Sequence, residues 1–117
     1  MPQSHEHLTR AKENEQLAIG LGRESGCSTD WAITMLFYAA LHYIDAFLAG
    51  KNMHPLNHEK RDSEIENNGS LAGIFKDYRR LKDLSRAARY EIANFREDQL
   101  EVARRRLKVI KGHLGHA

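Results

Sequence analysis

The sequence predicts an all-α fold, an up-and-down bundle of four to five helices that forms a single domain over residues 1–117. Apolar residues recur at intervals of three and four in several long segments, which is the period of a helix that buries one face. No segment combines alternating apolar and polar residues with β-branched enrichment, so strands are not expected. With 41% hydrophobic and 29% charged residues, the composition is that of an ordinary globular domain.

A first helix is predicted from Ser4, which can cap it, to the glycine-rich segment 20–26. Glycine destabilises a helix interior by about 1 kcal/mol relative to alanine, so this helix is expected to end by Gly26. Its apolar face carries Leu8, Ala11, Ala18 and Leu21. Residues 27–30 are then expected to form a short connection, in which Thr29 or Asp30 caps the next helix.

The next helix, Trp31 to Ala49, is apolar on almost every face and is therefore predicted to lie in the middle of the bundle. Its length approaches that of a membrane span. His42 and Asp45 count against insertion, because an aspartate deep in a bilayer helix costs about 2.5–3.5 kcal/mol. We therefore expect a core helix and no membrane contact.

Tyr38, His42 and Asp45 form a polar stripe on this helix, because their spacing places them on one face. In one interpretation the carboxylate orients the imidazole for general acid and base chemistry. In the other the three side chains only satisfy one another's hydrogen bonds in the core, and this second interpretation is favoured.

Gly50 is predicted to end the central helix, and Pro55 to keep the following segment as a loop. Asn57 can then cap a short polar helix that continues to about Glu66 and is expected on the surface. Residues 67–69, Asn-Asn-Gly, are a clear break.

Two amphipathic helices are predicted in the rest of the chain. Ser70 is expected to cap a long helix that ends near Tyr90, and the last helix covers Asp98 to His113. The apolar stripe of the long helix is Leu71, Ile74, Phe75, Tyr78, Leu81, Leu84 and Ala88. The stripe of the last helix is Leu100, Ala103, Leu107, Ile110 and Leu114.

Cysteine usage and the N-terminal sequence favour a cytoplasmic protein. Cys27 is the only cysteine, so no intramolecular disulfide can form. The N-terminal residues lack the basic segment and apolar stretch of a secretory signal. No Gly-rich phosphate loop or Gly-x-Ser-x-Gly motif occurs, and no cofactor is predicted.

Histidine spacing gives little support for a metal site. His54 and His58 are four residues apart, but Pro55 places His54 before the helix begins. His5 and His7 belong to an N-terminal segment that is expected to be mobile. No recognised zinc spacing is completed, so no metal is predicted.

One edge of the long helix carries four basic residues at 3-4-3 spacing: Arg79, Lys82, Arg86 and Arg89. Such a stripe gains affinity for a nucleic-acid backbone by releasing counterions, without reading the bases. On the short helix His58 and Arg61 lie one turn apart and are candidates for further phosphate contacts. The other interpretation of both patterns is a solvated helix face.

Three motifs follow one another along the chain: Phe37-Tyr38-Ala39-Ala40-Leu41-His42, then Met53-His54-Pro55 with His58, then Tyr78-x-x-Leu81-x-x-x-Ser85-Arg86-x-x-Arg89-Tyr90. In order and separation they resemble the HEPN family of helical nucleotide-binding domains, particularly its small prokaryotic members, over Ala32 to Phe95. The resemblance implies a bundle of four or five helices, frequent homodimerisation, and a role in toxin–antitoxin pairs, phage defence or RNA cleavage.

Active members of that family carry an Arg followed, after four to six residues, by a His. Here Asn94 stands where a His following Arg89 is expected. Asn cannot act as a general acid or base, although it can hold a phosphate oxygen. Arg106 and His113 have the family's spacing. A chain with this many Arg and His residues is expected to contain such a pair by chance, so the match carries little weight.

The leading hypothesis is a non-catalytic, HEPN-like homodimer that binds RNA, a nucleotide or a nucleotidyltransferase-type partner protein. Its expected phosphate-binding residues are Arg61, Arg79, Lys82, Arg86, Arg89 and Asn94. One alternative is a metal-independent ribonuclease, for which the candidate catalytic residues are His42, His58, Arg86 and Arg89. A pure protein-interaction module is the other alternative.

Overall fold

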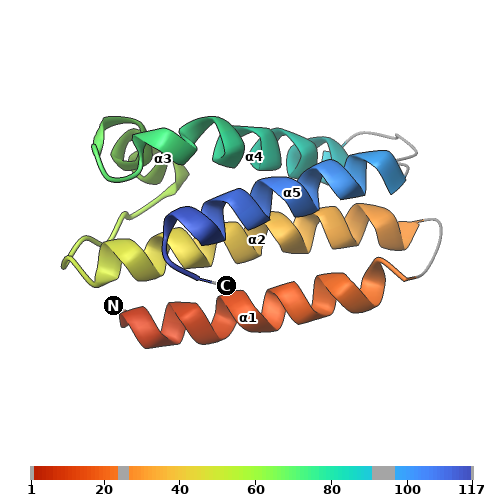
Figure 1. The fold of residues 1–117 in the computed structure, drawn as a ribbon, viewed down its shortest axis with the longest axis horizontal. Coiled ribbons are helices and arrows are strands. Elements are labelled where there is room, and N and C mark those ends of the chain that lie inside the picture. The colour runs from red at the N-terminus through yellow and green to blue at the C-terminus, as the bar shows by residue number, and fades with distance from the viewer. Residues whose placement is uncertain (1, 24–26, 91–96, 117) are drawn as a thin grey trace.

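Helix α2 (Cys27–Ala49) runs through the middle of the molecule, and the other long helices pack around it (Figure 1). α1 (Ser4–Leu21) lies along one side of α2. α4 (Phe75–Tyr90) and α5 (Glu97–His113) pack against α2 and against each other. The predicted position of the apolar helix at the centre of a bundle is therefore confirmed.

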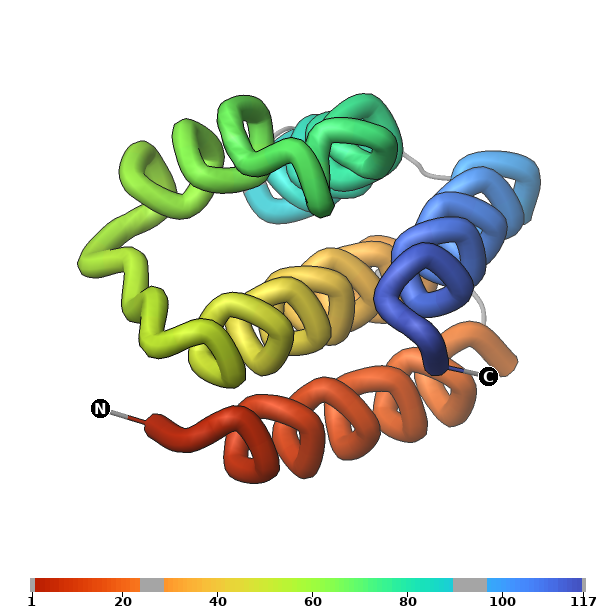
Figure 2. Tube along the Cα trace, turned by 60° about the vertical axis from the view of Figure 1, so that its left-hand side comes forward, coloured from red at the N-terminus to blue at the C-terminus, as the bar shows by residue number. Residues whose placement is uncertain are grey.

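The computed structural model describes residues 2–23, 27–90 and 97–116. These ranges contain helices and no strand, which confirms the predicted all-α bundle. Two shorter elements, α3 (His58–Asn67) and a 3-10 turn, η1 (Ala72–Ile74), precede α4. Figure 2 shows α3 beside the start of α4, joined to the end of α2 by an extended loop.

The burial of α2 explains its unusually apolar sequence. The segment Thr29–Ala49 is long and apolar enough to cross a membrane, with a mean hydropathy of 1.5. However, 72% of its most apolar 18-residue stretch is buried inside the molecule. Apolar residues all round are expected of a helix that is surrounded by others. Trp31 is an exception, because its side chain is 55% exposed.

The starts of the first two helices differ from the prediction. Gln3 rather than Ser4 is the N-cap of α1, and its backbone N–H donates to the Glu6 carboxylate at 2.9 Å. Ser4 is the first residue of the helix itself, and its hydroxyl donates to the Ala46 carbonyl of α2 at 2.8 Å. α2 begins at Cys27, so the expected connection over 27–30 is its first turn.

The C-terminal end of α2 is made by Asn52 rather than by Gly50 alone. Asn52 is left-handed, with φ 58°, and the N–H of the next residue, Met53, donates to the Leu48 carbonyl at 2.8 Å. This reversal satisfies a helix-end carbonyl and turns the chain back over the end of α2. It places the loop with Met53 and His54 close to the core.

Asn57 caps α3 as predicted, and its side chain accepts a hydrogen bond from the Lys60 N–H at 2.8 Å. The prediction of one continuous helix from Ser70 is wrong. The Ser70 N–H donates to the Asn68 side chain at 2.9 Å, the chain passes through η1, and α4 begins only at Phe75. Leu71 and Ile74 are nevertheless buried, so the buried face extends without interruption from the segment before α4 into α4.

α3 is less superficial than its polar sequence suggests. Two of its side chains, Arg61 and Ile65, are buried. α5 buries the predicted stripe at Leu100, Ala103, Leu107 and Ile110. The helices that carry the candidate site, α2, α3 and α4, are thus fixed against one core.

Candidate functional site

Arg61 of α3 reaches into the interior and pairs with Asp45 of α2. Its Nε lies 2.8 Å from Oδ1 and its Nη2 lies 3.0 Å from Oδ2, the two parallel hydrogen bonds of a guanidinium–carboxylate pair. Both side chains are buried, with 11% of Arg61 and 8% of Asp45 exposed. The pair therefore fixes α3, and the residues on its outer side, relative to α2.

Asp45 also keeps the buried guanidinium charged. Burial alone would lower the pKa of Arg61, but the hydrogen bonds and the charge of Asp45 outweigh burial and raise the pKa. We expected Arg61 to contact phosphate from the surface. Because its donors face Asp45 in the interior, its part is instead to position the helix.

His58 stands one turn before Arg61 and is exposed. Its Nδ1 lies 3.2 Å from Arg61 Nη1, and its ring is stacked with that of Phe37, with centroids 6.4 Å apart. A guanidinium only donates hydrogen bonds, so Nδ1 must accept, and the proton of the neutral imidazole is then on Nε2. His58 is thereby left with an N–H donor at the far side of its ring.

The charge environment favours the neutral form of this imidazole. Partial burial of the ring against its neighbours, followed by the nearby positive charges of Arg61 and Lys82, lowers the pKa of His58 below its usual value of 6.5. Arg89 acts in the same direction, while Asp62 opposes it. His58 therefore lies within the field of two residues of the basic stripe on α4, Lys82 and Arg89.

Asp62, the residue after Arg61, faces α4. Its Oδ2 accepts a hydrogen bond from Lys82 Nζ and lies 3.8 Å from Arg79 Nη1. The Arg79 side chain is 49% exposed, whereas Asp62 and Lys82 are mostly covered. The Asp62 carboxylate thus contacts two cations. It joins Arg79 and Lys82, the first half of the basic stripe, to α3.

The second half of the stripe lies against α2. Arg89 Nη1 donates to the Tyr38 hydroxyl at 2.6 Å, and its guanidinium carbon lies 5.7 Å from the centre of the Tyr38 ring. Arg86 is exposed. The predicted residues of α4 therefore share one side of the helix, which faces α3 at its start and α2 at its end.

The expected hydrogen-bonded set of Tyr38, His42 and Asp45 does not form, although all three share a face of α2. Tyr38 bonds to Arg89, Asp45 bonds to Arg61, and His42 Nδ1 lies 3.1 Å from His7 Nδ1 of α1. Side chains three or four residues apart on one helix have Cβ atoms about 5–6 Å apart. Each of the three polar groups therefore bonds to a side chain of a facing helix rather than to another member of the set.

The prediction for His7, which lies beside His42, is wrong. His7 lies in a regular turn of α1 and is half-buried, whereas a mobile terminal segment was expected. Ala11 and Ala18 of α1 are buried, and His7 lies four residues before Ala11 on the same face. That helical spacing was the available signal.

Of the remaining candidates, Arg106 and His113 do not join the site. Asn94 lies outside the described residues. Arg106 donates to Asp77 at 2.9 Å, and His113 Nε2 lies 2.6 Å from the Ser70 carbonyl oxygen. The formally spaced Arg106 and His113 are thus engaged with two different elements.

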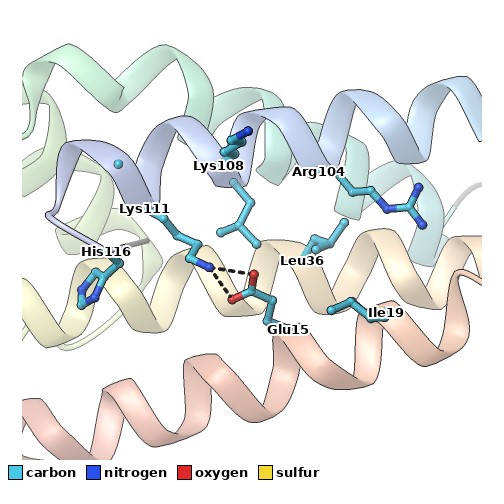
Figure 3. Close-up of a pocket in the computed structure, with 10 residues that line it drawn as sticks. Glu15, Ile19, Leu36, Arg104, Lys108, Lys111 and His116 are labelled. Carbon is cyan, nitrogen blue, oxygen red and sulfur yellow. Dashed lines mark hydrogen bonds and ion pairs between the residues drawn. The ribbon is translucent and has the colours of Figure 1, made fainter.

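A groove of about 550 Å³ lies between α1 and α5, with Leu36 of α2 in its lining (Figure 3). Lys111 reaches across it to the Glu15 carboxylate, at 3.0 and 2.9 Å from the two oxygens. Ile19 and Leu107 give it an apolar lining. Among the residues that the structure describes, none of the predicted phosphate-binding or catalytic residues lines this groove, so it is separate from the surface formed by α3 and α4.

No protein-family model, curated protein or solved structure matches the chain. The HEPN resemblance therefore stays a prediction from sequence motifs.

Proposed function

We propose that this helical bundle binds RNA through its phosphate backbone and does not cleave it. The binding surface is the side of α4 that carries Arg79, Lys82, Arg86 and Arg89, together with His58 of α3. One observation carries the proposal: buried and half-buried contacts, Arg61 to Asp45 and Lys82 to Asp62, hold α3 and the basic stripe of α4 on a common surface.

Charge at this surface favours a polyanion. Two cations of the stripe, Arg79 and Lys82, share one carboxylate, Asp62. Exposed Arg86 extends the positive charge along the same side of α4. Release of counterions from a phosphate backbone supplies affinity to such a surface without base-specific contacts.

The length of the stripe favours a chain of phosphates over a single nucleotide. Arg79 and Arg89 are separated by ten positions of one helix, which is about 15 Å at 1.5 Å per residue. A single phosphate group is too small to contact both ends. The motifs that resemble HEPN domains, with their links to RNA, favour RNA as the polymer.

The tautomer of His58 supports binding rather than catalysis. A general base must accept a proton, but Arg61 occupies Nδ1 and the neutral ring already carries its proton on Nε2. In this state His58 donates a hydrogen bond to a phosphate oxygen. His42 meets His7 instead of the basic stripe, so it does not supply the missing base.

A metal-independent ribonuclease is the second candidate, because the His58 imidazole lies within the field of Lys82 and Arg89. That mechanism requires His58 to exchange tautomers during the reaction. Homodimerisation and pairing with a nucleotidyltransferase-type protein, which the resemblance implies, remain predictions about assembly.

RNA binding is tested by fluorescence anisotropy with a labelled single-stranded RNA at low salt. The variant carries alanine at Arg79, Lys82, Arg86 and Arg89. A matched control loses the same number of positive charges elsewhere, at Arg80, Arg104, Arg105 and Lys108. We expect binding to be lost in the first variant and largely kept in the control. Equal affinities of the two variants would overturn the proposal.

Cleavage is tested separately by incubating the wild-type protein with end-labelled RNA in EDTA. We expect the RNA to remain intact. Cleavage that disappears in both His58→Ala and Arg89→Ala would replace the binding proposal with the ribonuclease alternative.

A further inference from the structure

His7 of α1 and His42 of α2 face each other across the contact between the two N-terminal helices. Their Nδ1 atoms are 3.1 Å apart, and their ring centroids are 5.3 Å apart at an angle of 31°. Asp45 lies one turn further along α2. One potential ligand atom from each of the three residues lies within 4.8 Å of the others.

We propose that His7, His42 and Asp45 bind a divalent transition-metal ion of the zinc or cobalt type. Two imidazole nitrogens and one carboxylate oxygen form a donor set that suits these ions better than magnesium or calcium, which prefer all-oxygen sites. None of the three ligands belongs to the proposed RNA-binding surface on α4, although the Arg61–Asp45 pair positions residues of both sites.

The spacing of the two imidazoles is close to that of metal ligands. Zinc–nitrogen bonds are about 2.0–2.1 Å long, so two nitrogens on a tetrahedral zinc ion are about 3.3 Å apart. The observed separation of 3.1 Å differs from this by a few tenths of an ångström. Small rotations of the two side chains, both on helices fixed against each other, make room for the ion between them.

The third ligand is already oriented. Each Asp45 oxygen accepts one hydrogen bond from Arg61, at 2.8 and 3.0 Å, and keeps a further lone pair. A carboxylate held by a second residue in this way is the usual support of a metal ligand. The Arg61 contact therefore orients Asp45 toward the two rings without using up its acceptor capacity.

The surroundings of His42 favour the form of its imidazole that metal binding needs. Burial, followed by the proximity of His7, lowers the pKa of His42, with Arg10 and Arg61 acting in the same direction and Asp45 opposing them. Neutral imidazole is the form that coordinates a metal.

The cluster opens into a cavity of about 360 Å³ between the start of α1, the end of α2 and the following loop. His54 and Met53 of that loop also line the cavity. It gives an ion a route to the three ligands and leaves space for water in a fourth position, as in zinc sites with three protein ligands.

The test is a calorimetric titration of untagged, EDTA-treated and dialysed protein with zinc chloride, repeated with cobalt chloride while visible absorption is recorded. We expect one ion per chain and the absorption bands of cobalt in a nitrogen and oxygen site. His7→Ala and His42→Ala are each expected to weaken binding by more than about 100-fold, the upper end of the losses seen when a ligand's support is removed.

His5→Ala is the matched control, since His5 is exposed in the same turn of α1. It should bind zinc as the wild type does. Circular dichroism of the metal-free variants checks that all are folded, and His7→Gln replaces His7→Ala if the latter is not. Zinc affinity that is the same in the His5, His7 and His42 variants would overturn the proposal.

The RNA-binding variant with four alanines on α4 keeps all three metal ligands. It should bind zinc with unchanged affinity. A failure of the RNA-binding proposal and a failure of the metal proposal are therefore distinguishable in the same set of proteins.

Discussion

Arg61 and Asp45 lie sixteen positions apart in the sequence and form a buried, doubly hydrogen-bonded ion pair between α3 and α2. The pair is central to the organisation of the molecule. The pair positions α3 so that His58 and Asp62 lie toward the basic stripe of α4. It also orients the Asp45 carboxylate toward His42. Both proposed sites therefore depend on the same contact.

Removal of either partner of this pair should destabilise the fold strongly. Arg61→Ala or Asp45→Ala leaves the other charge buried without compensation, which costs about 3–5 kcal/mol. Urea denaturation followed by circular dichroism measures the change. Arg104→Ala, which removes an exposed pair with Glu101, is the control and should change the free energy of unfolding by less than about 1 kcal/mol.

The double variant Arg61→Met, Asp45→Leu separates charge from packing. Since both charges are then absent, stability should recover much of the loss seen in the single variants. If the single variants are as stable as the wild type, the pair does not hold α3 in place.

The stability of the protein should decrease as the pH falls through the histidine range. The pKa of His42 is lowered in the folded state by burial and then by His7 and the nearby Arg10 and Arg61, against the opposing charge of Asp45. The unfolded chain therefore takes up protons below pH 6.5 before the folded protein does. The contribution of His42 is fully present above the unfolded pKa and is lost as pH falls toward the folded pKa.

Urea midpoints at about pH 7.5 and about pH 5.5, on either side of the histidine range, measure this effect. His42→Gln should show a smaller decrease than the wild type. An equal decrease in both proteins would mean that His42 does not contribute.

Tyr38→Phe should weaken RNA binding without unfolding the protein. Loss of the hydroxyl removes the acceptor that orients Arg89 at 2.6 Å, while the ring and its packing stay. A single such hydrogen bond corresponds to about a threefold to tenfold change in affinity. Tyr43→Phe is the control, because its hydroxyl bonds to Glu15 on α1, away from the stripe. Anisotropy titrations in which the two variants bind equally would contradict a role for Tyr38 in the surface.

Much of the fold follows from the spacing of apolar residues. The stripe of Leu100, Ala103, Leu107 and Ile110 has a regular helical period, and all four residues are buried. The break between Leu71 and α4 was not predictable in this way, because the 3-10 turn keeps Leu71 and Ile74 in phase with the helix that follows. The spacing of apolar residues indicates which face of a segment is buried, but it indicates less well at which residue the helix begins.

The candidate site was harder to predict, because its contacts join different helices. The basic residues of α4 were evident from their spacing, but their positions beside Asp62 and Tyr38 depend on how α3 and α2 pack. Arg61 appeared to be one exposed cation among several on a polar helix. Only its partner Asp45, on another helix, explains its burial.

The most direct test of RNA binding by the α4 surface is the salt dependence of affinity for a single-stranded RNA. Each phosphate contact contributes about −0.7 to the slope of log K against log salt concentration for single strands, so a surface that uses all four basic residues predicts a slope of about −3. Alanine at Arg86 and Arg89 should reduce its magnitude by about 1.4, as two contacts are lost. A slope that is the same in the wild type and in this variant would contradict the account.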